Sequence, residues 1–191
     1  MMDYLMWAKA LVLCVRSFKR VTDNIDAVLE GMAMSRGKSA RDTYSLMERA
    51  IDVIMRKQRI INLRVITTDM LNSLPDDKRH ILTCRYVLSD TIAAIAKSGD
   101  ISVRSVYRKL HAALLTCGDY LMKMGFDAGY FEKKYGKERW IFSTIRRFEA
   151  QEDAELSTAA AADGDLPRHN TWVCGGSQDQ LSGDGVGGAL V

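Results

Sequence analysis

The chain has 191 residues, with 27 Lys and Arg against 24 Asp and Glu, so its net charge is +3. Residues 149–191 hold eight of the acids and only one base, which leaves residues 1–148 with 26 bases, 16 acids and a net charge of +10. A field of that sign attracts polyanions such as nucleic acid or an acidic membrane surface. The two prolines, Pro75 and Pro167, are few helix breakers for this length. The composition therefore favours long helices over a β fold with many turns.

The sequence also argues against several classes of protein. Its longest wholly apolar run, Ala10 to Val15, is far shorter than the roughly 20 residues of a membrane-spanning helix. Asp3 and Lys9 do not fit a signal peptide, so we expect a cytoplasmic protein without a membrane partner. The four cysteines lack metal-binding spacing and are expected to be thiols. Since we find no nucleophile–base pair, paired carboxylates or metal-ligand set, we predict no catalytic residues, no metal, no cofactor and no enzymatic activity.

The first 73 residues carry heptad patterns typical of a coiled coil. In the first segment, apolar residues alternate in steps of four and three at Tyr4, Ala8, Leu11, Val15, Phe18, Thr22, Ile25 and Leu29. After a glycine-containing break at 31–39, a second helix is predicted over 42–73, with the stripe Met47, Ile51, Ile54, Gln58, Ile61, Val65 and Thr68. Two long helices joined by a short loop predict a coiled-coil helical hairpin over 1–73. The hairpin either packs only within its own molecule or also forms a homodimer through the coiled coil.

The remainder of the chain divides at Pro75. Four helices are predicted at about 76–88, 91–98, 102–124 and 129–148, and they form a second domain over 74–148. Residues 149–191 are acidic and rich in Gly, Ala and Ser, and we expect disorder from about residue 157. The expected fold class is therefore all-α: a long N-terminal coiled-coil hairpin, a helix-turn-helix bundle, and a disordered C-terminal tail.

The stretch from Leu74 to Leu115 carries the functional signal. Ile92, Ile95 and Ala96 form the inward face of a short helix, and a turn follows at 98–100. Ser102 is suited to cap the next helix, whose apolar face is formed by Val106, Leu110, Ala113 and Leu114. A short helix, a tight turn and a second helix with a basic outer face predict a helix-turn-helix whose second helix enters the major groove of double-stranded DNA.

The outward side chains of that second helix suggest how DNA would be bound. Arginines at 104 and 108 can form bidentate bonds to guanine, and Tyr107 can meet a thymine methyl group or a phosphate. Lys109, Lys97 and Arg85 are expected at backbone phosphates, which add affinity without sequence information. Arg85 could instead be a salt-bridge partner, with Tyr86 beside it as a core aromatic. The complete set of candidate DNA-binding residues is Arg104, Tyr107, Arg108, His111, Ser102, Ser105, Lys109, Lys97 and Arg85.

This stretch resembles region four of bacterial RNA polymerase sigma factors over about 42 residues. The matching positions are Leu74-Pro75, Arg79, Ile81-Leu82, Arg85-Tyr86, Ile95-Ala96, Ile101-Ser102, Ser105-Val106, Arg108, Leu110 and Ala113. Sixteen positions in register form a more specific signal than a lone short motif. The family commonly has Leu-Gly in the turn where this chain has Gly99-Asp100, which places the special backbone conformation one residue early, at Gly99.

The whole layout is similar to small prophage-encoded transcriptional regulators of the ArpU-like and RinA-like kind. That resemblance implies a DNA-binding transcription regulator of phage or prophage type, with RNA polymerase as a possible second partner. One alternative is a sigma-factor-like or polymerase-docking interaction module without DNA specificity of its own. Another is a structural adaptor of a phage particle, built around the coil.

Overall fold

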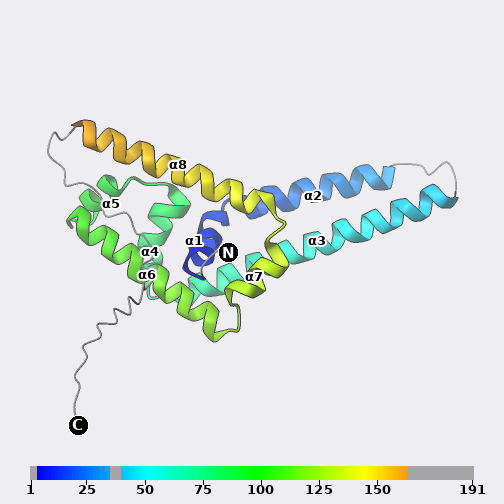
Figure 1. Ribbon diagram of the computed structural model, residues 1–191, viewed down its shortest axis with the longest axis horizontal. Coiled ribbons are helices and arrows are strands. Elements are labelled where there is room, and N and C mark those ends of the chain that lie inside the picture. Colours follow the sequence, from blue (N-terminus) through cyan, green and yellow to red (C-terminus); the bar gives the residue numbers. More distant parts are fainter. Residues whose placement is uncertain (1–3, 35–39, 163–191) are drawn as a thin grey trace, which may run out of the picture.

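The computed structural model describes residues 4–34 and 40–162, and this part of the chain is all-α, as predicted. Two helices that lie side by side project from the group formed by the others (Figure 1). The helices are α1 (Tyr4–Cys14), α2 (Ser17–Met34), α3 (Ala40–Asn72), α4 (Asp76–Leu82), the π-helical segment η1 (Thr83–Leu88), α5 (Ile92–Ser98), α6 (Val103–Lys123), α7 (Ala128–Tyr135) and α8 (Arg139–Ala162). No helix among these residues is long and apolar enough to cross a membrane.

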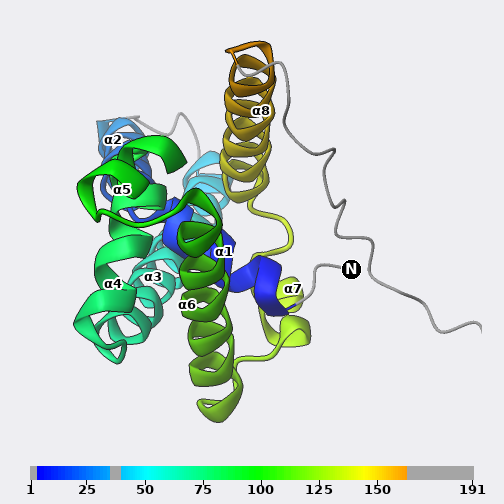
Figure 2. The ribbon, with the colours of Figure 1, turned by 90° about the vertical axis from the view of Figure 1, so that its left-hand side faces the viewer.

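Helix α1 lies at the centre of the molecule, enclosed by the other helices (Figure 2). Its sequence is apolar on nearly every side, and a helix of that kind is stable only when it is surrounded. Trp7, Leu11 and Val12 are almost completely buried, and the Trp7 ring stacks on Phe131 at a centroid distance of 5.2 Å. Helix α1 contacts both α6 and α8, so it joins the first part of the chain to the last.

The expectation of one continuous helix through residues 4–29 is wrong. The chain turns at Val15 and Arg16, and α2 then runs out beside α3 (Figure 1). Only the second half of the predicted pattern lies in the hairpin, where Phe18 and Ile25 are buried and Lys57 of α3 pairs with Asp26 of α2. The buried residues of α1 and of 74–148 also share one hydrophobic core. The boundary predicted between residues 73 and 74 therefore does not separate two cores.

The predicted stripe of α3 faces solvent instead of its neighbour α2. The side chains of Met47, Ile51 and Ile54 are 58%, 56% and 52% exposed. The partly buried side of the same helix carries Leu46 and Val53, and Val53 packs against the core. The hairpin is thus held by the residues outside the heptad stripe, and the stripe itself is left uncovered.

The C-terminal helices follow the predicted order, with two differences. The predicted helix 129–148 is broken between Tyr135 and Arg139, where Glu138 turns inward and accepts hydrogen bonds from Arg56 of α3 at 2.8–3.2 Å. Helix α8 also continues to Ala162, so the disorder expected from about residue 157 is wrong for residues 157–162. The remainder of the predicted tail, 163–191, lies outside the described residues.

Candidate nucleic-acid interface

Two short-range caps define the helix-turn-helix formed by α5 and α6. Thr91 precedes α5, and its Oγ1 accepts a hydrogen bond from the Ala94 N–H at 3.2 Å. Ser102 precedes α6, and its Oγ accepts from the Ser105 N–H at 3.2 Å. Each cap satisfies an amide that has no partner inside its own helix. The predicted capping role of Ser102 is confirmed.

The two helices are held together by the residues predicted for their apolar faces. Ile92, Ile95 and Ala96 of α5 are buried, and so are the four predicted inward residues of α6, Val106, Leu110, Ala113 and Leu114. Helix α6 continues inward from this motif, since it packs on α4 as well as on the central helix α1. The buried side of α6 therefore fixes which of its side chains point outward.

The turn differs from the expectation in one residue. Asp100 has a φ angle of 47°, in the left-handed region, whereas Gly99 has a φ of −91°. The left-handed residue is thus Asp100, and the expectation that this conformation sits at Gly99 is wrong. The Ile101 N–H donates to the Ala96 carbonyl at 3.0 Å, which closes the turn and returns the partly buried Ile101 toward the core. Aspartate is one of the few non-glycine residues that adopt this conformation with little strain.

Arg104 and Arg108 lie four residues apart on the uncovered side of α6, and both are exposed. Neither side chain forms an ion pair or hydrogen bond within the described residues. Two guanidinium groups one helical turn apart can each present a pair of parallel N–H donors to a base edge or a phosphate. Of the other predicted residues of this motif, four are exposed, namely Lys97, Ser102, Lys109 and His111, and Ser105 is partly buried.

Tyr107 lies at the edge of the exposed face and is 48% exposed. Burial raises the pKa of its hydroxyl, with a smaller contribution in the same direction from Glu152 and Glu155 of α8 and an opposing one from Arg85. The hydroxyl is therefore protonated at neutral pH and can donate a hydrogen bond. Its position places the acidic end of α8 beside the candidate interface.

The expectation that Arg85 contacts a DNA phosphate is wrong. Its side chain is 2% exposed, and its guanidinium donates to Glu155 at 2.9 Å, to Glu152 at 3.3 Å and to the Asp90 carbonyl at 2.9 Å. The ring of Phe148 lies 4.9 Å away on one face. Arg85 is therefore held inside the fold as a salt-bridge partner, the alternative role that the sequence offered for it. Tyr86 is buried beside it.

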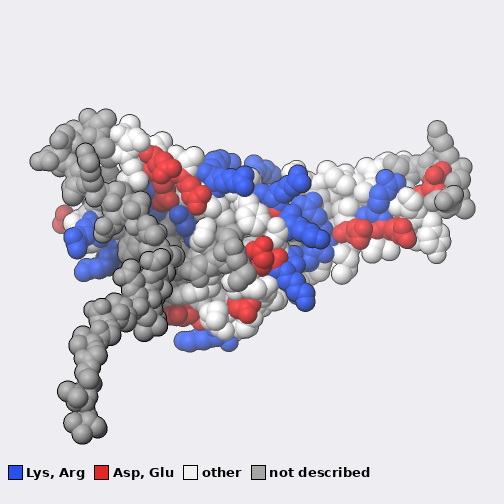
Figure 3. Space-filling view, in the orientation of Figure 1, with Lys and Arg blue, Asp and Glu red and all other residues white. Residues whose placement is uncertain are grey.

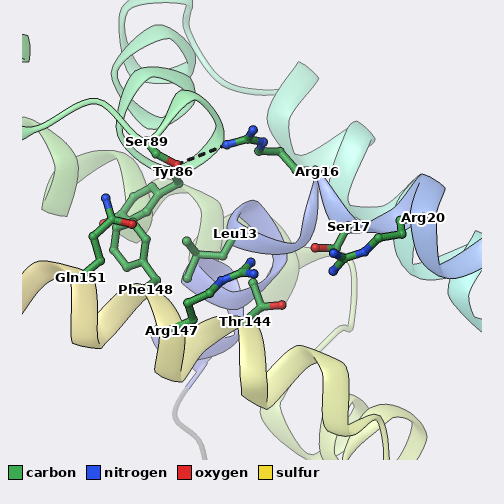
Figure 4. A pocket seen from close by; sticks show the side chains of 10 residues that line it. All are labelled: Leu13, Arg16, Ser17, Arg20, Tyr86, Ser89, Thr144, Arg147, Phe148 and Gln151. Atoms are coloured by element: carbon green, nitrogen blue, oxygen red, sulfur yellow. Dashed lines mark hydrogen bonds between the residues drawn. The ribbon is translucent and has the colours of Figure 1, made fainter.

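A second group of basic side chains lies away from α6. Figure 3 shows Lys and Arg gathered over the first half of α8 and the start of α2, and Asp and Glu over the second half of α8. Arg16, Arg20 and Arg147 of this region line one pocket of about 430 Å³ (Figure 4). No sequence motif connects these three arginines, so only the overall basic charge of residues 1–148 hinted at such a surface. No group of three or more potential metal ligands occurs among the described residues.

Comparison with known families agrees with this geometry. Residues 64–117 match the family model described as sigma-70, region 4, which spans the end of α3 through most of α6. No curated protein and no solved structure shows significant similarity to the chain. The matched segment is therefore a sigma-70 region-4-like helix-turn-helix, a type of domain that binds DNA and regulates transcription.

Proposed function

Because residues 64–117 form a helix-turn-helix similar to region 4 of sigma-70, we propose that this protein is a sequence-specific DNA-binding transcriptional regulator of phage or prophage type. Helix α6 enters the major groove of double-stranded DNA. The observation that carries the proposal is the pair of exposed arginines, Arg104 and Arg108, at the beginning of α6 with no partner inside the described part of the molecule.

Each outward residue of the motif has a role in this proposal. Arg104 and Arg108 bond bidentately to guanine, and Tyr107 meets a thymine methyl group or donates to a phosphate. Ser102, Ser105 and His111 lie along the same helix and contact the DNA near these residues. Lys97 of α5 and Lys109 of α6 neutralise phosphates, which positions the helix without selecting a sequence.

Binding to selected fragments tests the assignment. Fragments retained from random duplex DNA identify the preferred sequence, and Arg104→Ala or Arg108→Ala should weaken binding to it by ~1–3 kcal/mol while relaxing the preference at one position. Lys97→Ala should weaken binding to all sequences alike and lower the salt slope by about one. Arg49→Ala, an exposed arginine of the hairpin, is the matched control and should bind like the unchanged protein.

The opposite results would reject the proposal. Unchanged selectivity in both α6 arginine variants would remove α6 from the interface. Co-purification with RNA polymerase, together with no specific retention of any DNA fragment, would favour the alternative of a polymerase-docking module.

The exposed stripe of α3 supports a homodimer as the form that binds DNA. In heptad terms Ile51, Gln58 and Val65 occupy a positions, and Met47, Ile54, Ile61 and Thr68 occupy d positions. All of these are exposed except Ile61, which is partly buried. An uncovered a/d stripe of this length is stabilised when a second helix covers it, and a polar residue at one a position favours an in-register pair.

Charges beside the stripe favour a parallel pair of α3 helices. Arg64 lies at a g position and Asp69 at the e position five residues later, both are exposed, and neither side chain has an ion-pair partner within the described residues. In a parallel pair the two face each other across the interface, whereas an antiparallel pair brings like g positions together. The bodies of the two subunits then extend from the same end of the coil, as reading two half-sites requires.

Sedimentation of purified protein tests the homodimer. Ile54→Lys should convert a dimer to a monomer, because it places a charge in the centre of the apolar interface. Met122→Lys, at an exposed apolar residue of α6, is the control and should leave the mass unchanged. A monomeric parent protein, or a dimer that tolerates Ile54→Lys, would contradict this part of the proposal.

A further inference from the structure

The pocket shown in Figure 4 gathers three arginines from separate parts of the chain. Arg16 lies in the turn between α1 and α2, Arg20 lies one turn into α2, and Arg147 lies on α8. The side chains of Arg20 and Arg147 point toward each other across the opening, and Arg16 points toward Ser89, just after η1 (Figure 4). The pocket therefore lies where the start of α2, the end of η1 and α8 meet.

Within the described residues, no acidic side chain balances the positive charge of this pocket, since none of its lining residues there is Asp or Glu. Arg16 donates only to the Ser89 hydroxyl, at a long 3.4 Å, and Arg20 and Arg147 form no ion pair or hydrogen bond within the described residues. By contrast, Lys9, which does not line the pocket, pairs with Glu152 at 2.9 Å. Like charges that converge without a counter-charge repel each other, and an anion in the opening removes that cost.

The rest of the lining favours a small ligand over a wide surface. Leu13, Tyr86 and Phe148 form a buried apolar floor, and the Ser17 hydroxyl supplies a further hydrogen-bond donor at the side. A concave site of about 430 Å³ has the size of a small-molecule site, and its accessible lining is mainly polar. Guanidinium groups are the preferred partners of phosphate, which they bind through two parallel N–H donors.

We propose that the pocket formed by Arg16, Arg20 and Arg147 binds a small phosphorylated ligand that carries more than one negative charge. This site is separate from the candidate DNA-binding face, because no residue that lines the pocket belongs to α5 or α6. Since the walls come from α2, α8 and the loop after η1, a bound phosphate ties together the hairpin and the segment that leads into α5. The ligand would thus act on the rigidity of the helix-turn-helix without touching DNA.

Inorganic pyrophosphate is the probe for this site, with binding measured by calorimetry and by the change in melting temperature of the full chain. We expect pyrophosphate to bind and to raise the melting temperature of the unchanged protein. Arg147→Gln and Arg20→Gln should each weaken the binding by about tenfold or more, as the loss of a charge-assisted bidentate contact predicts. Arg146→Gln is the matched control, because Arg146 is an exposed neighbour on α8 that does not line the pocket.

Three results would overturn the proposal: no binding of pyrophosphate at millimolar concentration, equal binding by Arg147→Gln, or equal weakening by Arg146→Gln.

Binding to a random DNA duplex distinguishes the two possible sources of phosphate, a small ligand and the nucleic-acid backbone. If Arg147→Gln weakens binding to a random duplex and pyrophosphate does not bind, the pocket contacts the nucleic-acid backbone and the small-ligand proposal fails. Circular dichroism of each variant confirms that it is folded, and the α6 arginine variants test DNA binding independently of this outcome.

Discussion

Arg85 and Glu155 lie 70 positions apart in the sequence, yet the Arg85 Nη1 atom donates to a Glu155 carboxylate oxygen over 2.9 Å. The guanidinium is buried in η1, directly before the helix-turn-helix, and the carboxylate comes from the last third of α8. A second bond joins the Arg85 Nη2 atom to a Glu152 carboxylate oxygen at 3.3 Å. The acidic residues Glu152 and Glu155, which follow the basic residues 1–148, therefore belong to the folded structure of the DNA-binding module.

Arg85→Ala should lower the free energy of unfolding by about 3 kcal/mol, because removal of one partner of a buried ion pair leaves the other charges without compensation and opens a cavity. Chemical denaturation measures the change. Arg104→Ala is the control: its side chain is exposed, so its stability should stay within about 0.5 kcal/mol of the parent. Equal stability of the two variants would show that Arg85 does not anchor α8.

The close approach of α1 to α6 depends on Gly118. A Cβ atom at this position would lie 2.8 Å from two ring carbons of Tyr4, which is closer than side-chain contacts allow. Gly118→Ala should therefore destabilise the fold by ~1–3 kcal/mol despite the better helix propensity of alanine. Gly129→Ala in α7 is the control, because its Cβ would meet only ordinary contacts and should be neutral or slightly stabilising.

A double-mutant cycle identifies the cause of the Gly118 effect. If the clash with Tyr4 is responsible, Gly118→Ala should cost much less in a protein that already carries Tyr4→Ala. An equal cost in both backgrounds would contradict the assignment of the clash to the Tyr4 ring.

The features of the candidate interface that sequence predicted correctly are local ones. The cap at Ser102 and the inward positions of Val106 and Leu110 depend on spacings of three and four residues within one helix, and helical periodicity is sufficient to find them. The turn at Val15 and Arg16 has no such signal. It contains neither glycine nor proline, and the heptad pattern continues across it. What accompanies it is a set of long-range contacts, those of α1 with α6 and α8.

Long-range contacts explain the remaining differences. The heptad pattern in α3 places Met47, Ile51 and Ile54 on one face, but such a pattern does not determine which helix covers that face, and here α2 does not. The local sequence does not distinguish Arg85 from an exposed arginine, because its acidic partners Glu152 and Glu155 are 67 and 70 residues away. For the same reason, nothing in the spacing of Arg16, Arg20 and Arg147 reveals that they line one pocket.

The turn of the helix-turn-helix offers a stabilising substitution. Asp100 has a φ of 47° and is exposed, and glycine adopts this conformation without the steric cost that a Cβ atom brings. Asp100→Gly should raise the free energy of unfolding by about 0.5–1 kcal/mol. Gly99→Ala is the comparison: with φ at −91° it should not gain stability, since its Cβ would lie 3.3 Å from the Ile95 carbonyl oxygen. A loss of stability in Asp100→Gly would indicate that the carboxylate supports the turn.

Two buried thiols make the stability of the fold sensitive to alkaline pH. Burial raises the pKa of Cys14 and of Cys117 from the ordinary 9.0 to about 12. The folded state therefore keeps these thiols protonated at a pH where the unfolded chain ionises them. The stabilising contribution is complete below pH 9.0 and is lost as the pH rises from 9.0 toward 12, since unfolding then releases protons.

Denaturant unfolding at several pH values should accordingly show a fall in the free energy of unfolding above about pH 9. The double variant Cys14→Ala and Cys117→Ala should reduce the steepness of that fall, although Tyr86, whose pKa burial also raises, keeps part of it above about pH 10. At about pH 8 a thiol reagent should modify the partly buried Cys84 faster than either buried thiol, because access and thiolate fraction set the rate. Rapid modification of Cys14 in the folded protein would contradict the enclosure of α1 on which the whole core depends.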